Sequence, residues 1–584
     1  MLFATAGIYN STGNPLNRPL DPVIIRGADA ANFIDTAPAT IVGFMFSNSW
    51  HQIPIQVDER VEVSFKKVYN NTDTGMPDSV TFLAYADTNT FTGADTNLLF
   101  DGDDEISFMA FDGGSQAPDN TIFPIGTTNN AAEITILNPV NSNVCYIYIF
   151  QSDGSLTQDA GKDYIYYSFN LTSGDYKTTY NKDNGPNPET SVATSLYYRT
   201  EFSDRWIREV ERIYTDGADG TDILDRHRVS LPNNGVPRNE ETFTAGEGAF
   251  VANINGPIRC IRSYLGANSG PATQRIHFFY KQRQEIKTFL RVHSGIAGPR
   301  DTYNYVTTAA NMTYYNSENT GGYQIDGSAD TIISNTAAWE MVTGTHGTLI
   351  CNRLVDTDIP SFHQVNYYND DISQKPPTGN GHCFGMHGSW VNMSNLPSTD
   401  PLSGGHNHFI SRHIINYLGT NKTVAHATAI EEDILHPLET TITQFHGDSD
   451  SDGMADAWEL KYFGDLSHND TSDDDKTTPD GAINIQEYIA GTDPVNSESF
   501  PEISISNELS DIIVSFQTIN ADGDGYAGLH RIYTLKETPS LLTGTWNNIA
   551  GYTSITSSGN IVTYTNIIGQ YLNFYRIGIS LEND

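Results

Sequence analysis

The stretch GDSDSDGMADAWE at 447–459 places an acid at nearly every second position and then turns at a glycine. Such spacing fits the loop pattern D-x-D-x-D-G-x5-E, in which alternate residues of a tight turn point carboxylates inward. A calcium ion takes about six to eight oxygen ligands, and it relieves the repulsion between crowded carboxylates. A solvated acidic linker is the alternative. We favour calcium, and the predicted ligands are Asp448, Asp450, Asp452, Met454 (through its backbone carbonyl), Asp456 and Glu459.

A second loop matches only the later positions of the same pattern, in TPDGAINIQEY. Its predicted ligands are Asp480, Asn484 and Glu487. The first two ligand positions fall on Lys476 and Thr478, which cannot serve as carboxylate ligands. An inserted loop would let Asp473, Asp474 or Asp475 take their place, so the sequence leaves the first ligands of this site open.

The two loops, with ELKYFGD between them and AGTDP after them, resemble the calcium-binding tandem repeats of dockerins and thrombospondin type 3 regions. The resemblance covers roughly residues 446–496 and is closest to repeats that precede C-terminal β-domains in large secreted bacterial proteins. It implies an EF-hand-like module that acts as a cohesin-binding unit or as a rigid calcium-stabilised spacer. The position between two predicted domains favours the spacer.

Near the N-terminus, IPIQVDE at 53–59 and DGDDEISFMAF at 101–111 resemble the opening of secreted β-supersandwich proteins related to polysaccharide lyases. The acids of the second stretch give a further candidate calcium site, formed by Asp101, Asp103, Asp104 and Glu105. The alternative is a solvated turn that precedes a strand.

Nearly half of the 32 lysines and arginines lie between residues 199 and 300. This basic segment is a candidate for binding a polyanionic glycan through guanidinium–carboxylate contacts, with Arg275, His277 and Tyr280 as neutralising cation, base and phenol acid of a lyase. Structural ion pairs are the favoured alternative, since alternation along a strand places Tyr280 on the face opposite Arg275 and His277.

Histidines gather in GHCFGMHGSW and GGHNHFISRH, at 381–390 and 404–413. Imidazole and thiol groups are transition-metal ligands, but no fixed ligand spacing is present. Whether the region 382–413 binds a metal is left open.

Composition disfavours some classes of binding partner. The chain has 584 residues and a formal charge of −39, which disfavours nucleic acid. No stretch approaches the about 18–20 apolar residues of a membrane helix, so no transmembrane segment is expected. The four cysteines lack CxxC spacing, which leaves disulfides or buried thiols open.

Alternating apolar residues predict a mainly β, multidomain protein. We expect an N-terminal β-sandwich at 1–180, a β-rich middle domain at 181–436 with a helix near 406–418, the calcium module at 437–500 and a C-terminal β-sandwich at 501–584. The segment 195–214 is compatible with a helix or a long strand.

These features predict a secreted or cell-surface, calcium-stabilised structural or adhesive protein. Ala4-Thr5-Ala6 fits the end of a signal peptide. Residues 1–34 are apolar and punctuated by prolines, so strand exchange into a homo-oligomer or filament is a further hypothesis. The alternative function is a carbohydrate-active protein, glycan-binding or lyase-like, that acts on extracellular polyanionic glycans. Whether the protein is an enzyme stays uncertain, with no enzyme favoured.

Overall fold

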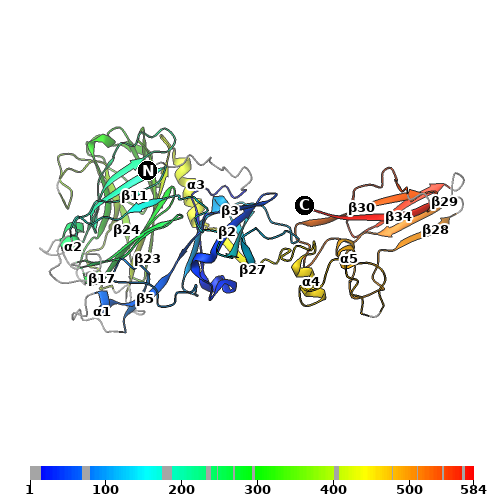
Figure 1. Cartoon of the computed structure of the whole chain (residues 1–584). Coiled ribbons are helices and arrows are strands. Elements are labelled where there is room, and N and C mark those ends of the chain that lie inside the picture. The colour runs from blue at the N-terminus through cyan, green and yellow to red at the C-terminus, as the bar shows by residue number, and fades with distance from the viewer. Residues whose placement is uncertain are drawn as a thin grey trace.

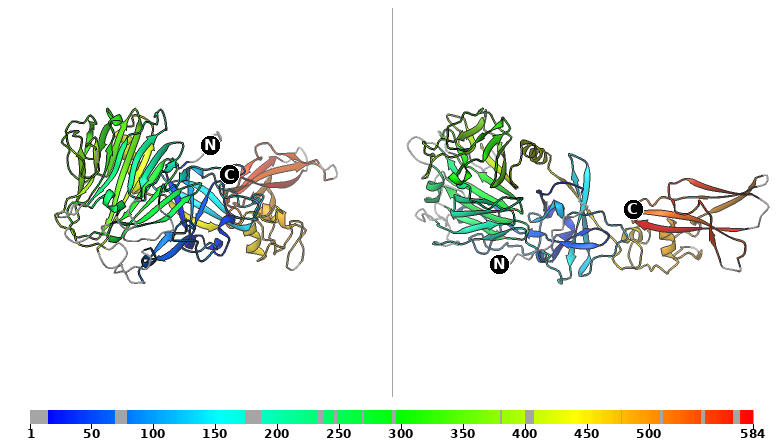
Figure 2. Two further views of the ribbon diagram at one scale, coloured as in Figure 1. Left: turned by 60° about the vertical axis from the view of Figure 1, so that its left-hand side comes forward. Right: turned by 90° about the horizontal axis from the view of Figure 1, so that it is seen from above.

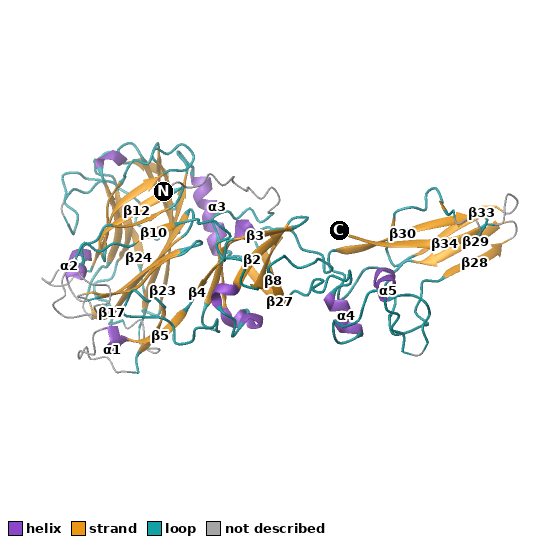
Figure 3. Cartoon of the chain, in the orientation of Figure 1, coloured by secondary structure: helices purple, strands orange, loops and turns teal. Residues whose placement is uncertain are grey.

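The computed structural model describes residues 15–68, 79–173, 187–231, 238–245, 248–267, 270–292, 296–379, 381–399, 407–476, 478–508, 511–541, 545–567 and 573–583. The molecule is elongated, with the middle domain at one end, the N-terminal sandwich in the centre and the C-terminal sandwich at the other end (Figure 1). Strands dominate in each part (Figure 3). The predicted mainly β, multidomain architecture is confirmed.

The N-terminal sandwich packs a three-stranded sheet against a five-stranded sheet. Apolar residues at alternate positions fill the space between the sheets, as period-two alternation predicts, for example Ile134 and Ile136 on one strand and Ile147 and Ile149 on the next. The first sheet contains β1 (Pro22–Arg26), β7 (Glu105–Met109) and β4 (Gln56–Asp58) in that order, and the second contains β27 (Glu439–Gln444), β8 (Thr127–Asn138), β9 (Asn143–Ser152), β2 (Ile41–Phe46) and β3 (Trp50–Ile53). A hairpin of β5 (Arg60–Ser64) and β6 (Thr81–Tyr85) extends from it and packs on the middle domain.

Two expected boundaries of this domain differ in the structure. Strand β27 pairs with β8 over its full length, from Glu439↔Leu137 to Gln444↔Ala132, so residues 439–444 belong to the sandwich and not to the calcium module. Residues 15–34 join the core of their own sandwich through Leu16, Ile25 and Phe33. The described part of the apolar segment 1–34, for which strand exchange is a hypothesis, therefore packs within its own sandwich, and residues 1–14 lie outside the described residues.

The middle domain is built on one nine-stranded antiparallel sheet. Two four-stranded sheets cover one face of it, and their side chains share a core with that face. The large sheet contains, in order, β15 (Ala249–Asn255), β16 (Cys260–Ala267), β17 (Gly270–Phe279), β18 (Arg283–Phe289), β26 (Phe409–Leu418), β23 (Gly347–Thr357), β22 (Trp339–Gly344), β20 (Thr313–Asn316) and β21 (Asn319–Gln324). The covering sheets contain β10 (Tyr166–Ser168), β11 (Ser191–Thr194), β12 (Tyr198–Asp204) and β13 (Ile207–Ile213), and then β14 (Leu224–Ser230), β19 (Arg300–Tyr305), β25 (Met386–Val391) and β24 (Gln364–Asn369).

The expected helix at 406–418 is wrong. Residues 409–418 form β26, which lies at the centre of the large sheet between β18 and β23. Five consecutive residues, 413–417, are buried because both faces of a central strand are covered, and such a run has no period-two pattern. The open segment 195–214 forms the β12–β13 hairpin, and β10 places the start of the middle domain before residue 180.

The C-terminal sandwich lies beyond the two loops (Figure 2). One sheet contains β28 (Ile503–Glu508), β29 (Asp511–Gln517) and β33 (Ile561–Ile567), and the other contains β31 (Asn547–Asn548), β30 (Leu529–Thr538), β32 (Ile555–Thr556) and β34 (Phe574–Asn583). The helices are α1 (Phe65–Val68), α2 (Glu240–Ala245), α3 (Val424–Leu435), α4 (Asp456–Tyr462) and α5 (Asn484–Ala490), with 3-10 turns at Gly27–Asp29, Ala31–Phe33, Pro38–Thr40, Ala110–Asp112 and Thr307–Ala309.

Two expectations from composition can be compared with the described residues. None of their helices has the length and apolar character needed to cross a membrane. All four cysteines are buried free thiols.

Candidate metal centre

The first acidic loop, called loop one (448–459), gathers its carboxylates around one point. Oxygens of Asp448, Asp450 and Asp456 lie within 4.8 Å of one another, and so do oxygens of Asp450, Asp452 and Glu459. Asp450 belongs to both groups, so the five predicted carboxylates form two overlapping groups within one loop. That spacing matches the oxygen shell of a bound calcium ion.

Local backbone geometry turns these carboxylates inward. The two oxygens of Asp448 accept hydrogen bonds from the amides of Asp452 (3.2 Å) and Gly453 (3.0 Å). Gly453 has a φ of 96°, a conformation that favours glycine, and this closes the turn. Helix α4 then starts at Asp456 and presents Glu459 back toward the loop. The side chain of Met454 is buried in the core of the module, and its backbone carbonyl remains a predicted ligand.

In loop one, the burial and contacts of Glu459 give the clearest indication that a cation binds there. Its side chain is fully buried, and both of its carboxylate oxygens lack a hydrogen-bond partner. Burial, reinforced by the charges of Asp452 and Asp450, raises the pKa of Glu459 to about 9. Burial also raises the pKa of Asp448 to about 6. A buried carboxylate without a donor or a cation is costly, so the residues fit a cation that binds them.

Loop two (473–487) resolves which aspartates replace the unsuitable residues. Oxygens of Asp473, Asp475 and Asp480 lie within 4.8 Å of one another, whereas Lys476 and Thr478 are exposed. Asp474 does not belong to this group, and its Oδ2 atom accepts hydrogen bonds from the side-chain amide of Asn484 (2.7 Å) and the ring of His468 (3.1 Å). Asp473, Asp475 and Asp480 are therefore the candidates for the first three ligand positions, with four residues between Asp475 and Asp480 where the pattern has one.

The closing ligands of loop two are also buried without partners. Asn484 Oδ1 and Glu487 Oε2 accept no hydrogen bond, and both side chains are at most 2% exposed. Burial raises the pKa of Glu487 to about 7, with the charges of Asp480 and Asp475 adding to the shift. In both loops, therefore, the residues predicted to close the ligand shell are buried and have oxygens without a hydrogen-bond partner.

In the structure, the acidic residues of 101–105 separate into two groups. Oxygens of Asp101, Asp103 and Asp104 lie within 4.8 Å of one another, as the sequence predicts. Glu105 does not join them, because its carboxylate bonds Arg259 (2.6 Å) and Arg60 (2.7 Å). Asp58 pairs with the same Arg259 at 2.7 Å. The residues that carry the supersandwich resemblance thus fix the middle domain to the N-terminal sandwich.

Much of the basic segment is internal. Its buried arginines are Arg205, Arg208, Arg228, Arg259, Arg262, Arg275 and Arg283. Arg262, for example, forms a two-pronged ion pair with Glu189, and neither side chain is exposed. All of these arginines except Arg205 form an ion pair with a carboxylate of their own chain.

The proposed glycan-binding trio does not converge. Arg275, His277 and Tyr280 are 1%, 1% and 3% exposed, so none of them lies on an open surface. Arg275 and His277 point between the sheets, where His277 bonds Tyr264 (3.0 Å). Tyr280 lies in a separate cluster with Met109 and Ile258. The reason is the strand alternation that separates residue 280 from 275 and 277.

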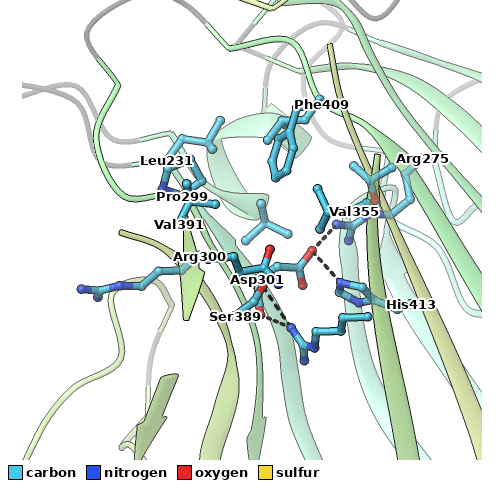
Figure 4. A pocket seen from close by; sticks show the side chains of 16 residues that line it. Leu231, Arg275, Pro299, Arg300, Asp301, Val355, Ser389, Val391, Phe409 and His413 are labelled. Carbon is cyan, nitrogen blue, oxygen red and sulfur yellow. Dashed lines mark hydrogen bonds and ion pairs between the residues drawn. The ribbon is translucent and has the colours of Figure 1, made fainter. Parts of the chain in front are cut away.

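A small cavity lies beside this region, between β19 and the large sheet (Figure 4). Its volume of about 30 Å³ holds about two water molecules and is too small for a sugar ring. Asp301 is its central carboxylate and bonds His227 (2.5 Å) and Arg275 (3.1 Å). His413 Nε2 lies 3.8 Å from Asp301.

The histidines of 382–413 do not form one site. Among the described members, His387 faces Glu340, His408 faces Asp356, and His413 joins Asp301 and His227. His406 lies outside the described residues. Sequence spacing could not link His227, Asp301 and His413, because they come from three strands that are far apart in the chain.

Comparisons with known proteins give no family. No family model matches the chain, and no curated protein is significantly similar to it. Among solved structures, a putative aldose 1-epimerase from Escherichia coli K12 aligns with 43% of this chain and 99% of its own, with 9% sequence identity and a TM-score of 0.20. A likeness at that TM-score carries no argument.

Proposed function

We propose that this chain is a calcium-stabilised, extracellular or cell-surface β protein with a structural or adhesive role. In this proposal, the module of loops one and two is a calcium-dependent spacer. The observation that carries it is the carboxylate of Glu459, which is fully buried and unpartnered among four aspartates. Such an arrangement is stable only with a cation at its centre.

Contacts on both sides of the module support the spacer role. On one side, the amide of Asp448 donates to the carbonyl of Thr121 in the N-terminal sandwich (3.2 Å). On the other side, Tyr488 donates to the carbonyl of Gly525 (2.7 Å), and Arg531 donates to the carbonyl of Ile489 (2.8 Å). The module therefore lies between the two sandwiches, and ions bound to its loops would hold their relative position.

The aromatic core of the module extends this link. Trp458 and Tyr488 pack with Tyr526 and Leu581, which belong to the C-terminal sandwich. Helices α4 and α5 have seven residues each, too short to be stable alone. Their stability depends on the loops that they close, so loss of the ions should loosen the whole module.

The calcium affinity expected of such loops favours an extracellular location. Loops of this type in extracellular modules bind calcium with dissociation constants of about 10⁻⁴–10⁻³ M, which suits a calcium-rich medium. The net charge of −39 also favours bound cations.

Limited proteolysis with and without a chelator tests the proposal. We expect chelation to expose cleavage sites within 446–496 before any site in the flanking sandwiches. Asp450→Ala should reproduce this pattern in calcium, because Asp450 contacts both halves of loop one. Asp465→Ala, which removes an exposed acid between the loops, is the matched control and should cleave like the parent protein. An unchanged pattern after chelation would refute the spacer.

A further inference from the structure

The outer face of the C-terminal sandwich carries two basic side chains directly opposite each other. Residues 501–584 contain three lysines and arginines against eight acids. One of the three, Arg531, is buried and donates to the carbonyl of Ile489 in the loop module. The other two, Lys536 on β30 and Arg576 on β34, are register partners in one sheet. Like charges in directly opposed positions of a sheet repel each other, so this placement costs stability.

Both cations lie on the side of the sheet that faces away from the core. Leu535 and Ile577 face the core of the sandwich, so alternation places Lys536 and Arg576 on the outward face. Arg576 is exposed and Lys536 is half-buried. Glu537, the nearest acid along β30, lies on the inward side and accepts a side-chain amide at 2.8 Å. Within the described residues, no carboxylate forms an ion pair with either cation, so their charge is available to a ligand.

Aromatic rings flank the two cations on the same face. The guanidinium carbon of Arg576 lies 4.4 Å from the centre of the Trp546 ring, so the charge is held beside an aromatic plane. Phe574, two residues before Arg576 on β34, is 46% exposed. Asn548 pairs with Lys536 and also faces outward. The face therefore offers apolar ring surface, an amide and two positive charges side by side.

We propose that this surface, formed by Lys536, Trp546, Phe574 and Arg576 and called the tip surface, binds an acidic polysaccharide built from uronic acids. Aromatic side chains offer a flat apolar area on which the apolar face of a pyranose ring packs. Guanidinium groups bind carboxylates through charge-assisted hydrogen bonds that are frequently paired. A uronate residue carries both features on one ring, which matches the mixed chemistry of this face.

Other polyanions fit the tip surface less well. A protein that binds anionic membranes electrostatically uses a cluster of about four to eight basic residues. A typical nucleic-acid-binding protein makes about six to ten phosphate contacts. The tip surface has two cations, and the chain carries a formal charge of −39, so phosphate-rich partners meet too little positive charge.

The tip surface lies at the end of its sheet away from the loop module. Leu581, near the end of β34, packs with the core of the module. Phe574 precedes it by seven residues of the same strand, or about 23 Å. The C-terminal sandwich forms one end of the elongated molecule (Figure 1). A surface at that end suits an adhesive contact with the loop module as a spacer behind it, and the inference rests on the adhesive role proposed above.

Biolayer interferometry of the full chain on immobilised polygalacturonate, in calcium, tests the tip surface. We expect binding that weakens as salt is raised, because salt screens the contact between guanidinium and carboxylate. Dextran, a neutral glucan, should not bind. Arg576→Gln should weaken binding about tenfold, since it removes hydrogen bonds to a charged group. Lys461→Gln is the matched control, because Lys461 is an exposed cation beside the ring of Tyr462 in the loop module, and it should leave binding unchanged.

Three outcomes would overturn the inference. The first is no binding to polygalacturonate, and the second is binding that Arg576→Gln leaves unchanged or weakens only as much as Lys461→Gln. The third is stronger Arg576-dependent binding to duplex DNA or to phosphatidylserine vesicles, which would identify a different class of partner. Thermal unfolding checks the fold of Arg576→Gln, whose melting temperature should stay close to the parent's because one of two opposed cations is gone.

Failure of the proposed spacer would appear separately. If chelation leaves the proteolysis pattern unchanged while polygalacturonate still binds through Arg576, the spacer alone is refuted. If chelation loosens the loop module but polygalacturonate does not bind, the tip surface alone is refuted.

Discussion

Buried carboxylates occur in two very different settings in this molecule. Between the sheets of the middle domain, each central carboxylate faces a basic side chain: Glu189 faces Arg262, Asp301 faces Arg275, and Glu340 faces Arg353. In the loop module, Glu459 and Glu487 are equally buried, but neither forms an ion pair with a basic side chain of the described residues, and the nearby charges that act on them are other acids. The first region neutralises its own charge, and the second needs charge from solution.

This difference separates two sources of stability. A buried ion pair brings its own compensation, so the middle domain should fold without added ions. Carboxylates buried together gain such compensation only by binding a cation, so under the proposal the stability of the module should depend on calcium concentration. The following tests probe that distinction, from the largest expected effect to the smallest.

The largest effect should come from breaking a self-neutralised pair. Arg262→Met leaves Glu189 buried without a cation, and we expect a loss of about 3–5 kcal/mol in the free energy of unfolding of the middle domain. Urea denaturation, followed by near-ultraviolet circular dichroism, measures it. Calcium should not rescue the loss. Arg262→Met/Glu189→Leu should recover much of it, and a double variant as unstable as the single one would contradict the pairing.

Acid should act on the two regions in opposite directions once calcium is stripped. Burial lowers the pKa of His227 from 6.5 to about 4. As pH falls from 6.5 to 4, His227 becomes protonated in the unfolded chain but stays neutral in the folded domain. This difference alone removes about 3 kcal/mol from the free energy of unfolding in that window. The middle domain should weaken below pH 6.5.

The module should respond the other way over a higher pH range. The pKa of Glu459 is raised to about 9, so the folded loop holds a proton that the unfolded chain releases between pH 4.5 and 9. Stability of the stripped module should therefore rise as pH falls through that range. Calorimetric scans at pH 8, 6.5 and 5 measure both trends, and parallel shifts of the two transitions would break the comparison.

The effect of Glu459→Gln on the stability of the module should change sign when calcium is added. In chelator, the folded parent must hold a proton on Glu459, which glutamine does not require, so the variant should be as stable as the parent or more stable. In calcium, it loses a carboxylate ligand, and the affinity of loop one should fall at least tenfold. Thermal unfolding in both conditions gives the two signs. Destabilisation of similar size in both would mark Glu459 as a packing residue.

The smallest effect tests the ligand assignment of loop two. Asp475→Asn should weaken the second calcium site several-fold, because it removes charge from a proposed ligand. Lys476→Ala is the matched control, since Lys476 is exposed and occupies the nominal ligand position without serving it. Calorimetric titration compares the two, and equal effects would reject the assignment of Asp475.

Local patterns predicted these regions with unequal success. Loop one was predictable from the sequence because all of its carboxylates lie within twelve residues, so spacing alone places them. The insertion in loop two was only partly predictable, since three adjacent aspartates offer the same chemistry and the fold selects Asp473 and Asp475. Strand β26 was mistaken for a helix because burial on both faces removes the alternation.

Contacts between residues far apart in the chain leave no pattern in the local sequence. Arg262 meets Glu189 across 73 residues of chain. Such convergence depends on the register of the sheets, which composition and periodicity do not encode.

The return of β27 to the N-terminal sandwich has a consequence for synthesis. Strand β8 ends its pairing with Leu137↔Glu439, so its partner emerges from the ribosome about 300 residues later. At translation rates of about 5–20 residues per second, β8 waits about 15–60 s as an open sheet edge. During that interval its free backbone groups are a template for unwanted pairing. A nascent chain stalled before residue 439 should therefore aggregate more readily than one stalled after residue 445.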